Sequence, residues 1–181
     1  MNKIHQSTKI HSSARIEPGA VIYENCKIGR NSIIGANAVL RPGTVIGNST
    51  IFGTCSVSEG DNYIGDNTTI HAQCHITAGM YIGNNVFIAP FFCQANTPNL
   101  LQGENVKYGS KPSLSHTRLE GFIEEGVVIG VGVIVNPGIR IGKFSKIDMN
   151  TYVTKDVPAN SHVRSGKEIV GRIIGTTDGG I

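Results

Sequence analysis

Charged residues are scarce in this chain of 181 residues, and long apolar runs are absent. Asp, Glu, Lys and Arg make up 16% of the residues, and the formal net charge is only +3. There is no run of Lys and Arg, so a nucleic-acid partner has little support. No stretch approaches the eighteen apolar residues of a membrane span, and the first residues lack the basic start and apolar run of a secretory signal. So little charge fits a molecule whose flat faces are partly covered by other copies of itself.

Paired cysteine motifs are also missing. The four cysteines, Cys26, Cys55, Cys74 and Cys93, show no CxxC spacing. This argues against a structural zinc site or a disulfide framework, and it favours free thiols in a reducing compartment. We therefore expect no metal centre, a cytoplasmic location, and a packing role for Cys26 and Cys74.

What the chain does contain is a strict period of six. Twelve of the fifteen positions reached by stepping from residue 4 to residue 88 in sixes are isoleucine, and only Ser58 is polar. The same step returns later in the chain at Ile123, Ile129, Val135, Ile141, Ile147 and Val153. Neither an α-helix nor an isolated alternating strand has this period, whereas repeat architectures do.

Each hexad predicts one short strand and one corner. An even step keeps the apolar column on one face of an extended strand, and the residue two before it is usually small. Glycine often follows the column, and scattered Asn, Pro and Asp mark turns. Three such strands close a triangular coil of eighteen residues, and stacked coils form an all-β solenoid of parallel strands. A β-sandwich is the alternative, but hairpin loops of variable length would not hold this register.

Three interruptions break the repeat, and function in a solenoid is expected where the repeat is violated. We predict a single domain with coils over about 2–93 and 120–156, a projecting loop over about 94–119, and a C-terminal cap over about 157–181. Val157-Pro158 is expected to end the coil stack, because proline cannot donate to a ladder. The third interruption is Ser58 with the acidic residues Glu59 and Asp61, which predicts a solvated or loosened corner.

Two segments resemble the bacterial hexapeptide-repeat acyltransferases, and within them most closely the sugar-nucleotide N-acetyltransferases. They read IGNNVFIAPFFCQANTPN at 82–99 and EGFIEEGVVIGVGVIVNPGIRIGKFSKIDMNTYVTKDVPANS at 120–161. The resemblance implies a left-handed parallel β-helix, a homotrimer, and acetyl-CoA as co-substrate along the later coils. It also implies that Gly130 and Gly132 face the pantetheine arm and that Lys155 meets the CoA phosphates, where a cation is favourable.

The acceptor site is expected at the start of the loop. Many O-acetyltransferases of this family carry a general-base histidine there, but the stretch QANTPN has none. Asn96 matches the Asn of a Phe-Thr-Asn stretch in the sugar-nucleotide branch, while Gln94 and Ala95 depart from it. An asparagine can orient a neutral amine, so the missing histidine favours nitrogen over oxygen as the acceptor.

Three histidines are candidates for a base. His71 and His75 flank column residues and should project outward, with His75 about 10 Å from Asn96 by strand geometry. His116 lies in the loop. Each of them could instead be a surface or interface residue.

The leading hypothesis is therefore acetyl-CoA-dependent N-acetylation of a nucleotide-linked amino sugar for surface polysaccharide synthesis. O-acetylation of a sugar or small molecule with His75 or His116 as base is the alternative. A γ-type carbonic anhydrase is disfavoured, because His71 and His75 differ by one residue from the spacing of that family's paired histidines. A non-catalytic solenoid would need no acetyl donor.

Overall fold

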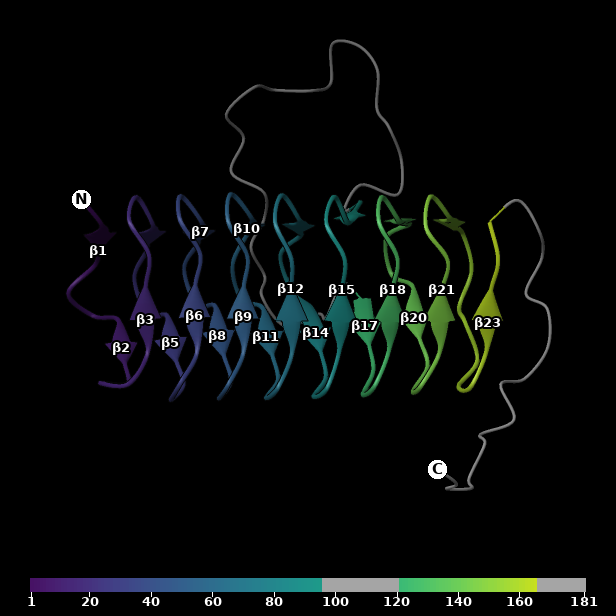
Figure 1. Ribbon diagram of the computed structural model, residues 1–181, viewed down its shortest axis with the longest axis horizontal. Coiled ribbons are helices and arrows are strands. Elements are labelled where there is room, and N and C mark those ends of the chain that lie inside the picture. Colours follow the sequence, from purple (N-terminus) through teal and green to yellow (C-terminus); the bar gives the residue numbers. More distant parts are fainter. Residues whose placement is uncertain (96–120, 166–181) are drawn as a thin grey trace, which may run out of the picture.

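The chain folds into one straight stack of triangular coils. The structure is a computed structural model that describes residues 1–95 and 121–165, and it places β1 and β23 at opposite ends of the stack (Figure 1). Every strand pairing is parallel, and the strands form three sheets that make the three faces of a prism. The all-β, left-handed parallel β-helix of hexapeptide repeats that the sequence predicts is confirmed.

The three sheets take every third strand in turn. Sheet A holds β1 (Lys3–Ile4), β4 (Val21–Ile22), β7 (Val39–Leu40), β10 (Val57–Ser58), β13 (His75–Ile76), β16 (Cys93–Gln94), β19 (Ile134–Val135) and β22 (Tyr152–Val153). Sheet B holds β2 (Lys9–Ile10), β5 (Lys27–Ile28), β8 (Val45–Ile46), β11 (Tyr63–Ile64), β14 (Met80–Ile82), β17 (Gly121–Ile123) and β20 (Arg140–Ile141). Sheet C holds β3 (Arg15–Ile16), β6 (Ile33–Ile34), β9 (Ile51–Phe52), β12 (Thr69–Ile70), β15 (Phe87–Ile88), β18 (Val128–Ile129), β21 (Lys146–Ile147) and β23 (His162–Val163).

Corners form because one residue in most of them takes a left-handed backbone conformation. Apart from glycine, these residues are most often Asn, as at Asn25 (φ 59°), Asn67 (φ 53°) and Asn85 (φ 56°). Asn tolerates this region better than most residues, because its short polar side chain bonds locally. The scattered asparagines of the repeat therefore mark the corners, as the sequence predicts.

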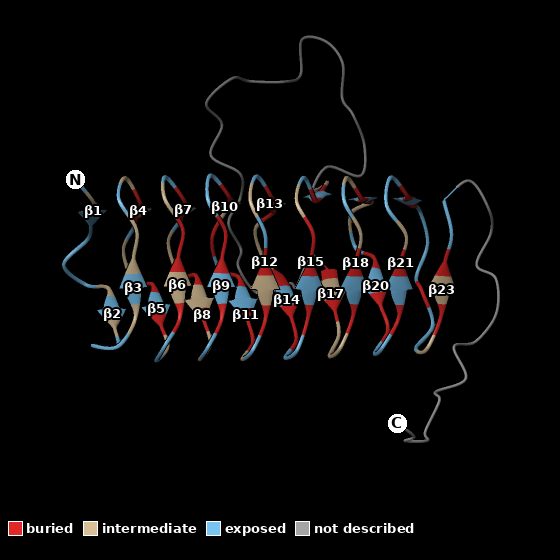
Figure 2. Cartoon of the chain, viewed as in Figure 1, coloured by how far each residue is buried: buried red, intermediate tan, exposed pale blue. Residues whose placement is uncertain are grey.

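The column side chains fill the inside of the prism. Ile34, Ile64, Ile70, Ile76 and Ile88 are fully buried, and red buried segments follow the coils from β4 onward in Figure 2. Each column residue lies against its counterpart in the next coil, so the core is a set of axial ladders about 4.8 Å apart. The small positions are buried as well. Cys26 and Cys74 have exposures of 0% and 2%, and all four cysteines are free, as predicted.

The long interruption enters between β16 and β17 without disturbing the stack. Partners on neighbouring coils lie eighteen residues apart before it, as for Lys3 and Val21, but Cys93 pairs with Ile134 across it. The predicted loop lies mostly outside the described residues. Its root, Gln94, is the inward-facing member of β16 and is 2% exposed.

Ser58 does not loosen its coil, which corrects the sequence prediction. Its side chain is fully buried at the column position. Its hydroxyl lies 2.9 Å from Thr44 Oγ1 and accepts a 2.8 Å bond from Asn62 Nδ2. Asn62 Oδ1 in turn accepts the Met80 backbone N–H at 2.7 Å. A hydroxyl is tolerated in the apolar column because this buried network satisfies it.

The stack also continues beyond Val157-Pro158, where the sequence predicts its end. Val157 donates its N–H to the Arg140 carbonyl, and β23 pairs with β21 through His162 and Lys146. This last coil is two residues shorter than the others, because Lys146 and His162 are sixteen positions apart. Pro158 is accommodated because it lies in the corner between Val157 and β23, where no ladder N–H is needed.

Candidate functional site

An imidazole–carboxylate pair lies on the outer surface of sheet A, one coil before the loop. His75 Nε2 is 3.2 Å from Glu59 Oε1, and the two side chains are 43% and 25% exposed. The other oxygen, Glu59 Oε2, accepts a 3.4 Å hydrogen bond from Thr77 Oγ1. Because Nε2 faces the carboxylate, Nδ1 is the ring nitrogen left to exchange a proton with a substrate. This is the orienting geometry that a general base requires.

The pair is held in place by the buried network beneath it. Glu59 follows Ser58, whose hydroxyl is fixed by Thr44 and Asn62, and the Glu59 N–H donates to the Ile76 carbonyl. His75 stacks in register with Cys93 on the next coil, next to the root of the loop. The acidic corner noted in the sequence is therefore the partner of His75. The signal that links them is the eighteen-residue coil, which brings residues 58 and 76 together.

The surroundings of Cys93 do not activate its thiol as a nucleophile. Burial raises the pKa of its thiol, and the nearby Glu59 carboxylate raises it further. The reactive form of cysteine is the thiolate, and this environment disfavours it at neutral pH.

Gln94 is a buried polar side chain at the loop root. Both its Oε1 and its Nε2 lack a hydrogen-bond partner among the residues that the structure describes. Its amide occupies the space beside Gly121, where a Cβ would lie 2.5 Å from Gln94 Nε2. The glycine at the start of β17 thus leaves room for the side chain of the glutamine that ends β16.

His71 is placed differently from His75. It lies in the corner that follows sheet C, and its ring packs edge-on against Phe87 with centroids 5.1 Å apart. Phe87 belongs to sheet C, whereas His75 faces outward from sheet A. The two histidines predicted as site residues therefore have different partners, and the contact of His71 is one of packing.

The two predicted cofactor glycines have a packing reason of their own. A Cβ on Gly130 would lie 2.5 Å from the Met149 backbone N, and Gly132 has a φ of +68°. Neither observation requires a ligand.

The surface beside these glycines is apolar and open. Val131 and Met149 are 40% and 61% exposed in the corner, and Ile134 and Tyr152 are 45% and 60% exposed on the outer side of sheet A. Sequence analysis missed this strip, although Ile134 and Tyr152 are eighteen residues apart and pair in register. Lys155 is exposed two residues after β22, which is the last strand of sheet A. The strip and the cation together suit a ligand with an apolar arm and an anionic end.

The remaining sequence candidates, Asn96 and His116, lie outside the described residues. Within residues 1–95 and 121–165, no group of three His, Cys, Asp or Glu side chains could hold a metal ion. Over the same ranges no helix is long and apolar enough to cross a membrane.

Family models for two kinds of hexapeptide repeat match the chain. The bacterial transferase hexapeptide matches residues 7–42, and the hexapeptide repeat of succinyl-transferase matches residues 122–155. The two matches lie on either side of the loop.

Curated relatives match about half of the chain. A galactoside O-acetyltransferase of Lactococcus lactis is 34% identical over 107 residues, which is 55% of this chain and 49% of the relative. A galactoside O-acetyltransferase of Escherichia coli is 37% identical over 98 residues, or 54% of this chain and 44% of the relative. The chain thus spans about half the length of these relatives.

Among solved structures, a Francisella novicida UDP-N-acetylglucosamine acyltransferase is similar in fold. Its TM-score is 0.64 at 22% identity, over 94% of this chain and 68% of that one.

Proposed function

The chain belongs to the hexapeptide-repeat transferase family, and on that premise we propose that it is an acyltransferase that takes an acetyl group from acetyl-CoA. The observation that carries this proposal is the His75–Glu59 pair, an oriented base on the open face of sheet A next to the root of the loop. The names of the curated relatives support acetyl transfer as the reaction.

In the proposed reaction, the acceptor atom attacks the thioester carbonyl carbon of acetyl-CoA. The carbon–sulfur bond then breaks, and CoA leaves as a thiol once it has gained a proton. His75 Nδ1 removes the proton that the acceptor loses, and Glu59 stabilises the imidazolium through Nε2. Glu59 is in this scheme a positioning residue, since it acts through His75.

We assign the acetyl-CoA arm to the apolar strip on sheet A. Val131, Met149, Ile134 and Tyr152 would pack against the pantetheine, and Lys155 would face the phosphates. Asn96 remains the predicted residue that orients the acceptor. Gly130 and Gly132 would leave room for the arm, in addition to their role in coil packing.

The acceptor that we favour is an amine of a nucleotide-linked sugar, in a pathway of surface polysaccharide synthesis. The reason is that QANTPN carries no histidine at the start of the loop. The second candidate is a sugar hydroxyl, which the names of the two galactoside O-acetyltransferases favour. The His75–Glu59 pair can take up the proton that either acceptor loses, and a hydroxyl needs such a base more than a neutral amine does.

The test measures thiol release from acetyl-CoA with matched pairs of sugars that differ only in an amine or a hydroxyl. Turnover with the amine alone supports N-acetylation, and turnover with the hydroxyl alone supports the second candidate. His75→Ala should lower kcat by about 10²- to 10⁴-fold. His71→Ala is the matched control and should leave kcat within about threefold, since its ring packs on Phe87. Absence of acetyl-CoA binding in the wild-type protein would contradict the whole proposal.

We also propose a homotrimer. Sheet C carries outward Ile51, Phe87 and Val128, which are 39%, 41% and 41% exposed. Phe87 and Val128 are direct partners, and Thr69 lies between Phe87 and Ile51. An apolar stripe of this kind is typical of an interface between subunits. Sedimentation of the wild type should give a trimer, and Phe87→Glu should give monomers. Lys146→Glu, on the same sheet but outside the apolar stripe, is the control. A monomeric wild type would contradict this part of the proposal.

A further inference from the structure

The positive charge of the chain is concentrated in its first coils. Residues 1–41 contain six Lys or Arg and two Glu, whereas the rest of the chain contains ten basic and eleven acidic residues. The excess of basic residues over the whole chain therefore comes from the first two coils and the beginning of the third. Neither the acyl-transfer site nor the apolar strip uses these residues.

Two of the lysines lie side by side. Lys9 of β2 and Lys27 of β5 are direct partners in sheet B, and both point outward from the prism. Adjacent strands are about 4.8 Å apart, so the pairing places two like charges on neighbouring positions of one face, and an anion bound between them would relieve their repulsion. No ion pair joins Lys9, Lys27 or Arg30 to a carboxylate anywhere in residues 1–95 and 121–165.

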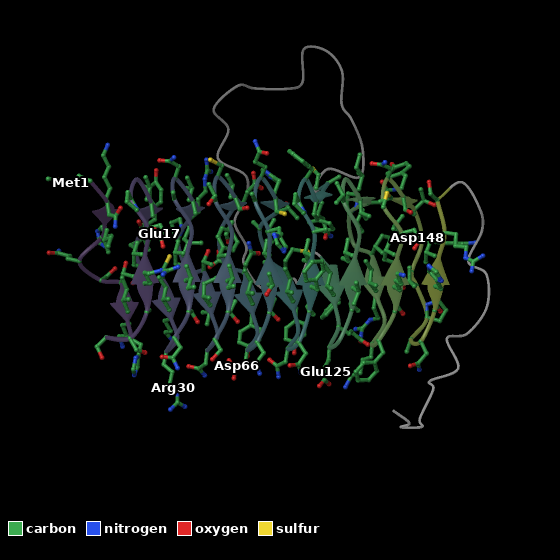
Figure 3. The ribbon with its side chains drawn as sticks, in the orientation of Figure 1. Met1, Glu17, Arg30, Asp66, Glu125 and Asp148 are labelled. Atoms are coloured by element: carbon green, nitrogen blue, oxygen red, sulfur yellow. The ribbon has the colours of Figure 1, made fainter. Side chains whose placement is uncertain are left out.

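A hollow of about 640 Å³ lies beside the lysines. Its wall includes Lys9, Lys27, Arg30 and His11, and Gly29 and Gly47 leave it open. A Cβ on Gly29 would lie 2.4 Å from the Gly47 carbonyl oxygen, so the stacking of the coils requires glycine at this position in the wall of the hollow. Figure 3 shows Arg30 projecting from the edge of the prism along which Asp66 also lies.

The polar side-chain groups of the hollow are mainly donors. His11 Nδ1 accepts the Ser13 N–H at 3.2 Å, which leaves the Nε2–H of the neutral ring as a donor. The nearest acceptors are already used. Asn48 Oδ1 accepts the Arg30 N–H at 3.0 Å, and Asp66 Oδ1 accepts the Asn48 N–H at 2.7 Å. The residues that line the hollow therefore carry two ammonium groups, a guanidinium and an imidazole.

We propose that this hollow binds a diphosphate group. Two neighbouring phosphates match two neighbouring lysines, and Arg30 can bind phosphate oxygens through two N–H groups at once. The strand β5 of this site is three strands from β14 in sheet B, and β14 belongs to the same coil as His75. The two sites are therefore about 14 Å apart along the axis. The hollow is separate from the acyl-transfer site, and the proposal does not depend on the proposed function.

The test is a calorimetric titration of the full chain with inorganic pyrophosphate at low ionic strength. We expect saturable binding that weakens as NaCl is added. Lys9→Gln and Lys27→Gln should each weaken it by about tenfold, as expected for loss of one charge-assisted hydrogen bond. Lys146→Gln, an exposed lysine on sheet C, is the matched control and should bind as the wild type does.

Two further arms distinguish the source of the diphosphate. Tighter binding of UDP than of pyrophosphate would identify a nucleoside diphosphate, and tighter binding of CoA would identify the cofactor. Both affinities should also be measured with Lys9→Gln, and this variant must bind UDP or CoA more weakly than the wild type does. Absence of pyrophosphate binding, or an equal loss in Lys146→Gln and Lys9→Gln, would overturn the proposal. Circular dichroism of each variant confirms that the lost binding is not lost folding.

Discussion

Glu59 is the residue whose role can be separated from that of His75. Its carboxylate lies 3.2 Å from His75 Nε2 and does not face the ring nitrogen assigned to the substrate. We expect Glu59→Gln to lower kcat by about tenfold or more with little change in KM.

Glu17→Gln is the control for that experiment, since Glu17 pairs with Arg15 at 2.8 Å on a distant coil. If Glu59→Gln kept the wild-type kcat, or lost activity only through a raised KM, the proposed positioning role would be wrong. Steady-state kinetics makes the measurement.

Asp148 gives a second test at the scale of single residues. A hydrogen bond from His162, whose Nε2 lies 2.7 Å from Asp148 Oδ1, lowers the pKa of this carboxyl. A lowered pKa in the folded state adds stability above the pKa of the unfolded chain, and this is lost as pH falls through the folded pKa. Asp148→Asn should therefore lower the melting temperature by about 2 °C at pH 7.

At pH 3 the difference between wild type and Asp148→Asn should shrink, because this pH lies below the ordinary pKa of an aspartate, about 3.9, where the stability from a lowered folded pKa is progressively lost. Thermal denaturation at both pH values measures this. An equal loss at pH 3 and pH 7 would mean that the pair does not stabilise the last coil through charge.

At the scale of the element, corner glycines serve two different purposes. Gly130 has no room for a side chain, since a Cβ would lie 2.5 Å from Met149 N, whereas Gly138 has nothing within 4 Å but a φ of +75°. Gly130→Ala should lower the free energy of unfolding by about 1–3 kcal/mol through overpacking. Gly138→Ala should cost about 1 kcal/mol through backbone strain alone. Urea denaturation compares the two, and a smaller loss for Gly130→Ala would contradict this account.

The strand β10 tests how a polar residue is tolerated in the column. Ser58→Ala removes a hydroxyl that accepts a hydrogen bond from Asn62 Nδ2 and that also forms a hydrogen bond with Thr44 Oγ1. Leaving these buried groups without their partner should cost about 1–3 kcal/mol. The control is Ser12→Ala, an exposed serine in the corner after β2, which should change the stability little. Stabilisation by Ser58→Ala would show that the network is dispensable.

The elements follow from the sequence more closely than the site does. A six-residue column fixes which side chains face inward, because strand side chains alternate, and Asn at the corners fits the left-handed conformation. The last coil could not be predicted from Pro158, since the sequence does not reveal that this proline lies in a corner. The burial of Ser58 could not be predicted for a related reason. Its partners Thr44 and Asn62 are a coil or a corner away, so burial of the network appears only when the coils stack.

The site was predictable only in part, because surface contacts between coils depend on side-chain direction. The sequence indicates His75 as a candidate base and Glu59 as part of an acidic corner. Their pairing depends on the direction in which the Glu59 side chain lies on sheet A, which the sequence does not reveal. His71 lies four residues from His75, yet its ring packs on Phe87. Periodicity places both outside the prism and does not say which neighbour each one meets.

At the scale of the whole molecule, the described chain has one core but no single centre. Each coil contacts only the coils before and after it, so stability is a sum of similar neighbour interactions. The proposed sites are spread along this axis, with the basic hollow on the first coils and the apolar strip on the later ones. Their separation is set by the number of coils between them.

The ladder of parallel strands also determines how the protein should respond to a pulling force. A load applied along the axis meets coils that are nearly identical in length and bonding, so they should detach one at a time from an end. Each released coil of eighteen residues adds about 60 Å of extended chain. Force spectroscopy should therefore record a regular sawtooth with that spacing, interrupted by one longer step where the chain between β16 and β17 is released.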